Sequence, residues 1–385
     1  MNHEKHHGHF EAPREKKRLT GRQKGALGIV LALAVLIGLG VGIYKTVVRP
    51  PQKTEPVVET QPEAEETKEP EIKLPTIKHV VTKVDEDTGE EVEEEMELPA
   101  SHREGVYNIL ICGTDDDGYR TDTIIVAHLD EETHDVALMS VPRDTAVNVS
   151  YKPKKMNQYY AAAENNGKDG VEALIGGAEQ ILGYRVDSYA LFDVEVFVEL
   201  IDAMGGIDFD VPVDMDYDDP GQNLSIHVQK GYQHLNGYQT MGVFRFRNTY
   251  ANGDIGRIDV QHQLLKAMTS QFLKLHNIPN LNKLIDIYEK DVTTNLSAGN
   301  VMFYVKEFLK LDESAISFET IPANYSGTKN GMSYVFIHVD EWLDYLNTWL
   351  NPYTEEITSA DVDILYESNG QVVATSGTVQ GPNKW

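Results

Sequence analysis

A run of twenty uncharged residues near the N-terminus constrains this chain more than any other feature. Residues 25–44 read GALGIVLALAVLIGLGVGIY. A helix rises about 1.5 Å per residue, so one of this length spans about 30 Å, the hydrocarbon core of a bilayer. Six lysines and arginines precede the run between positions 14 and 24. Because basic residues stay on the cytoplasmic side of a membrane, we expect residues 1–24 in the cytoplasm and the rest of the chain outside.

A cleaved signal peptide is the alternative interpretation of this segment. The apolar run is longer than the core of a signal peptide, and no small-residue cleavage site precedes Lys45. We therefore predict an uncleaved signal anchor, one transmembrane helix, over residues 25–47. Residues 48–104 are rich in Pro, Glu, Thr and Lys and end in an acidic run. Such a segment has little apolar surface to bury, so we predict a disordered acidic linker with one short hairpin around Asp87.

The charge balance narrows the choice of partners. The chain has 34 Lys plus Arg against 61 Asp plus Glu. A nucleic-acid-binding protein needs a basic face, so we expect no nucleic acid partner. If this chain binds a phosphate group, its basic residues must be concentrated locally. The single cysteine, Cys112, excludes an intrachain disulfide and lies in an apolar run that is typical of a buried strand.

Residues 105–353 have the apolar periodicity of a globular domain. Apolar runs of strand length occur at 106–113, 122–130, 135–141 and 188–194. Helical spacing occurs at 171–183, 195–206 and 255–275. Strands and helices interleave, so we predict an α/β (α+β) domain with a mixed central β-sheet flanked by helices. We interpret residues 237–248 as ending in a strand, and residues 354–385 as a flexible C-terminal tail with one strand-like piece, VDILYE.

Arginines gather in four short segments, each at a predicted strand end or helix start. The arginines are Arg120, Arg143, the pair Arg245 and Arg247, and Arg257. Arg245 and Arg247 are two apart in the predicted strand and would share one face. Guanidinium groups bind phosphate oxygens through paired hydrogen bonds and do not lose their proton, so these positions suit a polyphosphate.

Carboxylates accompany the arginines. Asp115 and Asp122 flank Arg120, Asp144 follows Arg143, and Asp254 precedes the long helix. Mg²⁺ takes one or two carboxylates together with phosphate oxygens, so arginines and aspartates together suggest a pyrophosphate site. Structural ion pairs, and a helix N-cap at Asp254, are the alternative interpretations.

At these residues the sequence resembles the LytR-CpsA-Psr family of cell-wall glycopolymer ligases. The resemblance covers residues 105–270 well and 271–353 more loosely. Its main elements are Gly113-Thr-Asp115, Arg120-Thr-Asp122, Ser140-Val-Pro-Arg143-Asp144, Lys155-Met-Asn157, Gly205-Gly206-Ile-Asp208, Phe244-Arg245-Phe-Arg247 and Gly253-Asp254-Ile-Gly-Arg257.

The resemblance implies a Mg²⁺-dependent phosphotransferase. Such an enzyme moves an anionic glycopolymer, for example teichoic acid or capsule, from an undecaprenyl-pyrophosphate carrier to a peptidoglycan sugar hydroxyl. It implies that Asp115 and Asp122 hold the metal and that Asp254 is the base for the acceptor hydroxyl. Its pyrophosphate-binding residues would be Arg120, Arg143, Arg245, Arg247 and Arg257, with Arg245 and Arg247 also counted as catalytic.

The resemblance also implies a cellular location and partners. The protein would be a single-pass type II protein of the cell membrane of a Gram-positive-type bacterium, with its catalytic domain outside. Its partners would be a polyprenyl-pyrophosphate-linked glycopolymer, peptidoglycan and the membrane itself.

The sequence departs from the family at two points. Val260 stands where a second arginine is expected at the start of the long helix. The loop at residues 115–120 is short and lacks an extra arginine, besides Arg120, that is often found there. These departures keep two other functions open. One is a non-catalytic wall-binding or regulatory scaffold, and the other is a prenyl-pyrophosphate phosphatase that uses water as the acceptor.

Overall fold

A computed structural model defines the architecture of the chain. The residues it describes are 50–51, 76–84, 91–114, 121–219, 224–246, 260–261, 263–264, 266–268, 287–288, 290–308, 310–311 and 315–381. The predicted anchor at 25–47 lies outside these residues. Within them, no helix is long and apolar enough to cross a membrane.

A six-stranded mixed sheet forms the centre of the domain, in the strand order β11-β6-β3-β4-β5-β12. Strand β3 runs parallel to β6 and antiparallel to β4, and β5 runs antiparallel to β4 and parallel to β12. This arrangement confirms the predicted mixed sheet. The strands are β3 (Val106–Thr114), β4 (Thr121–Asp130), β5 (Asp135–Ser140), β6 (Ser188–Phe192), β11 (Thr293–Thr294) and β12 (Ile316–Thr320).

The central strands are buried on both faces because their side chains alternate between two apolar clusters. In β3, Ile109 and Ile111 belong to one cluster, whereas Leu110 and Cys112 belong to the other. Successive side chains of a strand point to opposite faces, so a strand covered on both sides reads as a continuous apolar run. That pattern is the reason why the strands were predictable from the sequence.

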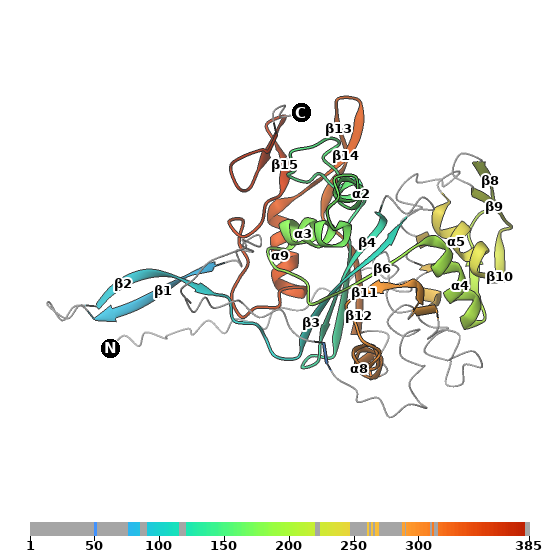
Figure 1. Cartoon of the computed structure of the whole chain (residues 1–385), viewed down its shortest axis with the longest axis horizontal. Coiled ribbons are helices and arrows are strands. Elements are labelled where there is room, and N and C mark those ends of the chain that lie inside the picture. Colours follow the sequence, from blue (N-terminus) through green and yellow to red (C-terminus); the bar gives the residue numbers. More distant parts are fainter. Residues whose placement is uncertain are drawn as a thin grey trace, which may run out of the picture.

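Helices cover both faces of this sheet (Figure 1). Helices α2 (Tyr159–Glu164), α3 (Gly170–Leu182) and α9 (Val339–Trp349) pack on one face. The buried indole of Trp342 in α9 donates a 2.8 Å hydrogen bond to the carbonyl of Ile181 and so ties α9 to α3. Helices α4 (Val194–Met204), α5 (Gly237–Arg245) and α8 (Ala298–Phe308) pack on the other face.

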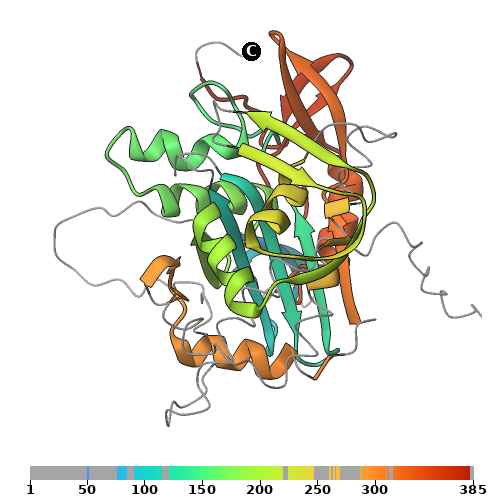
Figure 2. The same cartoon turned by 90° about the vertical axis from the view of Figure 1, so that its right-hand side faces the viewer.

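Helix α4 begins and ends where its sequence predicts. The Asp193 side chain accepts a hydrogen bond from the Val196 amide at 2.8 Å, which is an N-cap contact. At the other end Gly205 adopts φ 93°, a left-handed conformation that favours glycine. The chain then enters a two-stranded sheet of β7 (Ile207–Val211) and β10 (Gly231–Leu235). Between them lies the hairpin β8 (Met215–Asp219) and β9 (Leu224–Val228), and Figure 2 shows these strands in front of the main sheet.

A hairpin occupies part of the segment that was expected to be an extended linker. Strands β1 (Thr76–Val84) and β2 (Glu91–Pro99) pair antiparallel over nine residues each. Two paired strands on either side of residues 85–90 agree with the expected short hairpin, and each is nine residues long.

The C-terminal residues 354–381 differ from the flexible tail that was expected. Ile357, Val362 and Ile364 are buried in the same apolar cluster as α3 and α9. Strands β15 (Leu365–Ser368) and β16 (Gln371–Ala374) form a hairpin. This hairpin packs beside a second one, made of β13 (Ala323–Lys329) and β14 (Met332–Ile337). The segment is ordered because its scattered apolar residues complete the core.

Candidate active site

One edge of the main sheet carries Asp122 and Arg143, two of the three predicted site residues that the structure describes. Because β3, β5, β6 and β12 run in the same direction, their C-terminal ends meet at this edge, together with the N-terminal end of β4. Thr114 at the end of β3 pairs with Thr121 at the start of β4. Ligand sites of open sheets lie at the carboxyl ends of strands, so this edge is the expected place for one.

Asp122 and Arg143 meet at this edge. Arg143 Nη1 donates a 2.7 Å hydrogen bond to Asp122 Oδ1, and both side chains are about 30% exposed, at 31% and 29%. Within the described part of the chain, the other carboxylate oxygen of Asp122 has no hydrogen-bond or ion-pair partner. The pair therefore offers a charged guanidinium and one open carboxylate oxygen to a ligand at the sheet edge.

Asp144 and Lys155 extend the cluster. Lys155 Nζ donates a 2.8 Å hydrogen bond to Asp144 Oδ1 and lies 5.2 Å from the centre of the Tyr334 ring. Arg143 Nε lies 4.0 Å from Asp144 Oδ2, so the two ion pairs are joined. Lys155 had no assigned role in the sequence analysis, although its Lys155-Met-Asn157 motif was part of the resemblance. That motif was the signal that could have identified it.

Backbone hydrogen bonds hold the segments that carry these side chains. The amide of Asn157 donates to the carbonyl of Arg143 at 3.0 Å. The amide of Val335 in β14 donates to the carbonyl of Asp144, also at 3.0 Å. Such bonds fix the positions of the charged groups without using their side chains, which leaves the side chains available for binding.

The structure corrects the prediction that Arg245 lies in a strand. Residues Gly237–Arg245 form helix α5, which begins with a capping box in which Asn236 and Gln239 bond to each other's backbone amides. The alternation in residues 243–247 resembled a strand, but the capping box and the packing of the helix determine the local structure. Arg245 is half-buried in the last turn, where a cation is favoured by the helix dipole.

The start of the long helix lies against the end of α5. Gln261 Nε2 donates a 2.8 Å hydrogen bond to the carbonyl of Phe244. This contact brings the residue that follows Val260 next to the turn that carries Arg245. Val260 itself is 4% exposed and lies in the apolar cluster with Leu264 and Met268. In this chain the position of the expected second arginine is therefore a core position.

Several predicted residues lie outside the described residues. Asp122, Arg143 and Arg245 are described, and of these the structure brings Asp122 and Arg143 into contact. Among the described residues, no three His, Cys, Asp or Glu side chains are grouped as a metal site. The predicted residues outside this part of the chain are Asp115, Arg120, Arg247, Asp254 and Arg257.

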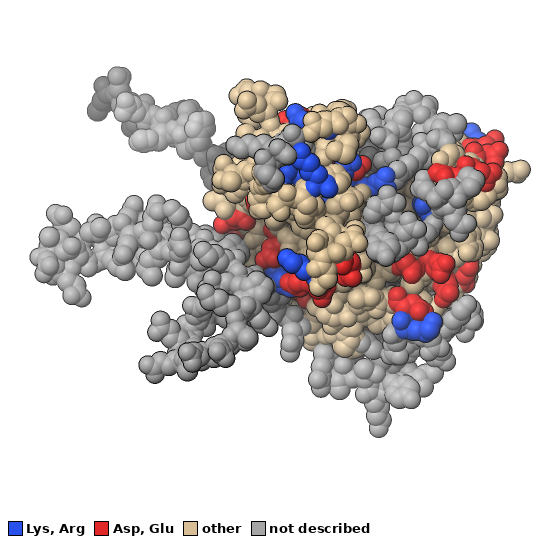
Figure 3. Space-filling view, turned by 45° about the horizontal axis from the view of Figure 1, so that its top comes forward, with Lys and Arg blue, Asp and Glu red and all other residues tan. Residues whose placement is uncertain are grey.

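The surface charge agrees with a local concentration of basic residues. Figure 3 shows a group of Lys and Arg side chains near the top of the described surface, whereas its right and lower parts carry mostly Asp and Glu with a few Lys and Arg among them. Basic side chains therefore gather locally on this face, although the chain has a formal net charge of −27.

Comparison with known proteins identifies the family. The family model described as the LytR_cpsA_psr family matches residues 74–349. The chain therefore belongs to this family, as its motifs indicated.

Relatives with named functions are teichoic acid transferases. One is the polyisoprenyl-teichoic acid–peptidoglycan teichoic acid transferase TagV of Bacillus subtilis, 31% identical over 196 residues, which cover 49% of this chain and 50% of the relative. Another is the transferase TagU of Oceanobacillus iheyensis, 26% identical over 253 residues, covering 65% of this chain and 76% of the relative. The chain spans about half the length of the first of these relatives.

Solved structures share the fold. The crystal structure of B. subtilis TagV superposes with a TM-score of 0.51 at 27% identity, covering 64% of this chain and 96% of that one. TagT bound to LIIa-WTA gives a TM-score of 0.51 at 18% identity and covers 66% of this chain and 92% of that one. At that identity the second match concerns the fold alone.

Proposed function

We propose that this protein transfers an anionic glycopolymer of the teichoic acid type from a polyprenyl-pyrophosphate carrier to a sugar hydroxyl of peptidoglycan. The observation that carries the proposal is the joined ion pairs of Arg143 with Asp122 and Lys155 with Asp144, at the sheet edge where the chain carries its family motifs. The names of the relatives TagV and TagU support the same reaction.

The basic residues would stabilise the charge that develops on the phosphate oxygens. Phosphoryl transfer passes through a loose transition state, so catalysis consists mostly of positioning and of electrostatic stabilisation. The planar guanidinium of Arg143 can bind two phosphate oxygens, and the ammonium group of Lys155 adds a positive charge beside it. Arg120, Arg245, Arg247 and Arg257 would complete the pyrophosphate site.

A magnesium ion would fit beside Asp122. One oxygen of this carboxylate accepts from Arg143, and the other has no partner among the described residues. Mg²⁺ commonly binds one or two carboxylates together with phosphate oxygens and water. Asp122 and Asp115 would hold the ion, which would neutralise charge on the pyrophosphate. Asp254 would accept the proton of the acceptor hydroxyl.

The proposal extends to the location of the protein. A helix at residues 25–47 would anchor the chain, and the catalytic domain would face the outside of the cell, where a lipid-linked polymer meets peptidoglycan. Residues 48–104, including the β1–β2 hairpin, would connect the two. Labelling of single introduced cysteines from outside intact cells, at positions 60 and 10, tests this topology: only the first should react with an impermeant reagent.

One assay separates this function from its alternatives. The full-length chain in detergent is incubated with Mg²⁺, a prenyl-pyrophosphate-linked glycan and peptidoglycan oligomers, and the products are resolved by mass spectrometry. A glycan–phosphate–peptidoglycan product supports the proposal. Release of glycan phosphate without attachment identifies a phosphatase, and unchanged substrates identify a binding scaffold.

A further inference from the structure

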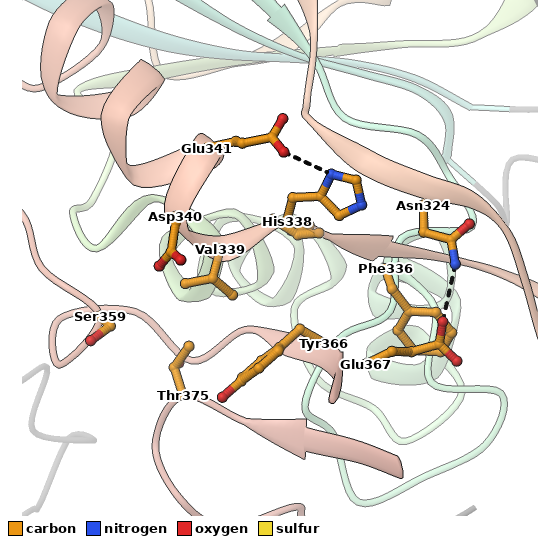
Figure 4. Close-up of a pocket in the computed structure, with 11 residues that line it drawn as sticks. Asn324, Phe336, His338, Val339, Asp340, Glu341, Ser359, Tyr366, Glu367 and Thr375 are labelled. Atoms are coloured by element: carbon orange, nitrogen blue, oxygen red, sulfur yellow. Dashed lines mark hydrogen bonds and ion pairs between the residues drawn. The ribbon is translucent and has the colours of Figure 1, made fainter. Parts of the chain in front are cut away.

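A half-open cavity separate from the sheet edge lies where the C-terminal segment meets the end of β14. Its volume is about 680 Å³. One side consists of the end of β14 and the first turn of α9, and the other consists of residues from the C-terminal segment (Figure 4). A cavity of this size accommodates a ligand of one to a few sugar rings or of comparable volume.

Four of the eleven residues that line the cavity lie beyond the family match. The match ends at residue 349, whereas Ser359, Tyr366, Glu367 and Thr375 line the cavity. The packed C-terminal segment is therefore what creates this space. The cavity therefore depends in part on a segment that the family model does not match. None of its lining residues belongs to the motifs that carry the resemblance.

The polar groups around the cavity fall into two sets. Some are already paired: His338 Nδ1 lies 3.4 Å from Glu341 Oε1, and Asn324 Nδ2 donates to Glu367 Oε2 at 3.0 Å. By contrast, the carboxylate of Asp340 and the hydroxyl of Tyr366 have no hydrogen-bond or ion-pair partner within the described part of the chain. These two groups, both on the cavity wall in Figure 4, are free to bind a ligand.

The combination of groups favours an uncharged saccharide. A carboxylate accepts hydrogen bonds from neighbouring hydroxyls, and a tyrosine offers an apolar ring face together with a polar tip. Val339 adds an apolar surface beside them. Glu367 is paired with Lys329 at 3.0 Å and Glu341 lies 3.4 Å from His338, so Asp340 is the carboxylate here without a cation among the described residues. Its negative charge would disfavour a phosphate-rich polymer. The wall-glycan acceptor therefore suits the cavity better than the polymer.

Strand β14 connects the cavity to the candidate active site. Tyr334 lies under Lys155, and the Val335 amide bonds to the Asp144 carbonyl. Phe336 and His338, two and four residues beyond Tyr334, line the cavity. At about 3.3 Å per residue, Phe336 lies roughly 7 Å along the strand from Tyr334, the residue in contact with Lys155.

We propose that this cavity is a subsite for the neutral sugar backbone of the acceptor glycan. The inference rests on the proposed function, in which the acceptor is a peptidoglycan strand. Sugar units bound here would hold the strand so that a hydroxyl farther along it lies near Arg143 and Asp122. Tethering one part of a chain raises the effective concentration of the next part at a neighbouring site.

A binding experiment tests the subsite without requiring catalysis. The full-length chain in detergent is titrated with a neutral N-acetylglucosamine tetramer and, separately, with a glycerol-phosphate oligomer of similar length, by isothermal titration or saturation-transfer NMR. We expect the neutral tetramer to bind. Tyr366→Ala should weaken its binding about tenfold by removing the ring, and Asp340→Asn about threefold by removing a charged acceptor.

Matched control variants lie on the other face of the sheet. Tyr232 is 76% exposed in β10, and its cross-strand partner in β7 is Asp210. Tyr232→Ala and Asp210→Asn remove the same chemical groups at a distance from the cavity, and each should leave the affinity for the tetramer within about twofold. In acceptor titrations of the transfer reaction, the cavity variants should raise KM for long glycans more than for a disaccharide.

The outcomes separate this inference from the function on which it rests. Absence of tetramer binding, equal effects of cavity and control variants, or preferential binding of the phosphate oligomer would each overturn the subsite. Transfer without any variant-sensitive tetramer binding would overturn the subsite and leave the proposed function intact. Variant-sensitive binding with no transfer would support the subsite and overturn the transferase.

Discussion

Arg143 Nη1 lies 2.7 Å from Asp122 Oδ1, although the two residues are 21 positions apart and belong to the ends of different strands. Asp122 is in β4, and Arg143 follows the end of β5. The antiparallel pairing of β4 and β5 brings the beginning of one strand to the end of the other. The pairing of these two strands therefore brings the two side chains together. The ion pair joins Asp122, a predicted metal ligand, to Arg143, a predicted phosphate-binding residue.

Replacement of Asp122 by asparagine tests the metal assignment. Asp122→Asn keeps the shape of the side chain but removes its negative charge, and we expect the affinity for Mg²⁺ to fall by roughly tenfold. Titration of the full-length chain with Mg²⁺ measures this change. Asp135→Asn, at the opposite end of the same sheet in β5, is the control and should leave the titration unchanged. An identical curve for Asp122→Asn would exclude this residue as a ligand.

We expect replacement of Arg143 by either lysine or alanine to lower the rate of transfer. Its guanidinium reaches Asp122 and approaches Asp144 at 4.0 Å, a geometry that a lysine point charge does not reproduce. We expect Arg143→Lys to lower the transfer rate about tenfold and Arg143→Ala about 10²–10³-fold, in the range found when a transition-state donor is removed. Arg185→Lys is the control, because Arg185 pairs with Glu172 at 2.7 Å on α3. Equal rates for the native chain and Arg143→Ala would remove Arg143 from the site.

Part of this site was predictable and part was not, for physical reasons. The strands were predictable because a strand buried on both faces is a continuous apolar run. The alternation near Arg245 predicts a strand, whereas the capping residues Asn236 and Gln239 begin helix α5. The local alternation is therefore misleading at this position. The contact of Arg143 with Asp122 depends on strand pairing between distant segments, and no local pattern encodes it. In residues 354–381 the apolar run VDILYE predicts a strand, and β15 begins within it, but the core contacts of this segment with α3 and α9 have no local pattern.

The C-terminal segment should contribute to stability through Asn148. This side chain is 1% exposed, and its amide donates to Asp363 at 2.9 Å and to the Thr378 carbonyl at 2.9 Å. Its oxygen accepts from the Gln380 amide at 2.8 Å. Asn148→Ala removes the part-buried hydrogen bonds to Asp363, Thr378 and Gln380, so we expect the free energy of unfolding to fall by roughly 3 kcal/mol.

Urea denaturation of the purified chain measures the effect of Asn148→Ala. Asn166→Ala is the matched control, because Asn166 is exposed and makes one hydrogen bond, to the Ala162 carbonyl. We expect this control to change the free energy of unfolding by less than about 0.5 kcal/mol. Similar losses in the two variants would mean that the C-terminal segment contributes little to the stability of the domain.

The buried histidine of β4 should make the folded domain sensitive to mild acid. Burial lowers the pKa of His128 to about 4, and its Nδ1 lies 2.9 Å from Asn108 Oδ1. The folded state therefore keeps this imidazole neutral at pH values where the unfolded chain, with a pKa of about 6.5, takes up a proton. Between these two values the unfolded state binds more protons, so stability is complete above pH 6.5 and is lost as the pH falls towards 4.

Integration of this difference gives a loss of roughly 2 kcal/mol by pH 5. Urea denaturation at pH 7.5 and 5.0 measures it, and His128→Gln, which cannot titrate, should lose about 2 kcal/mol less over the same interval. A variant that loses as much stability as the native chain would show that His128 does not titrate with a lowered pKa.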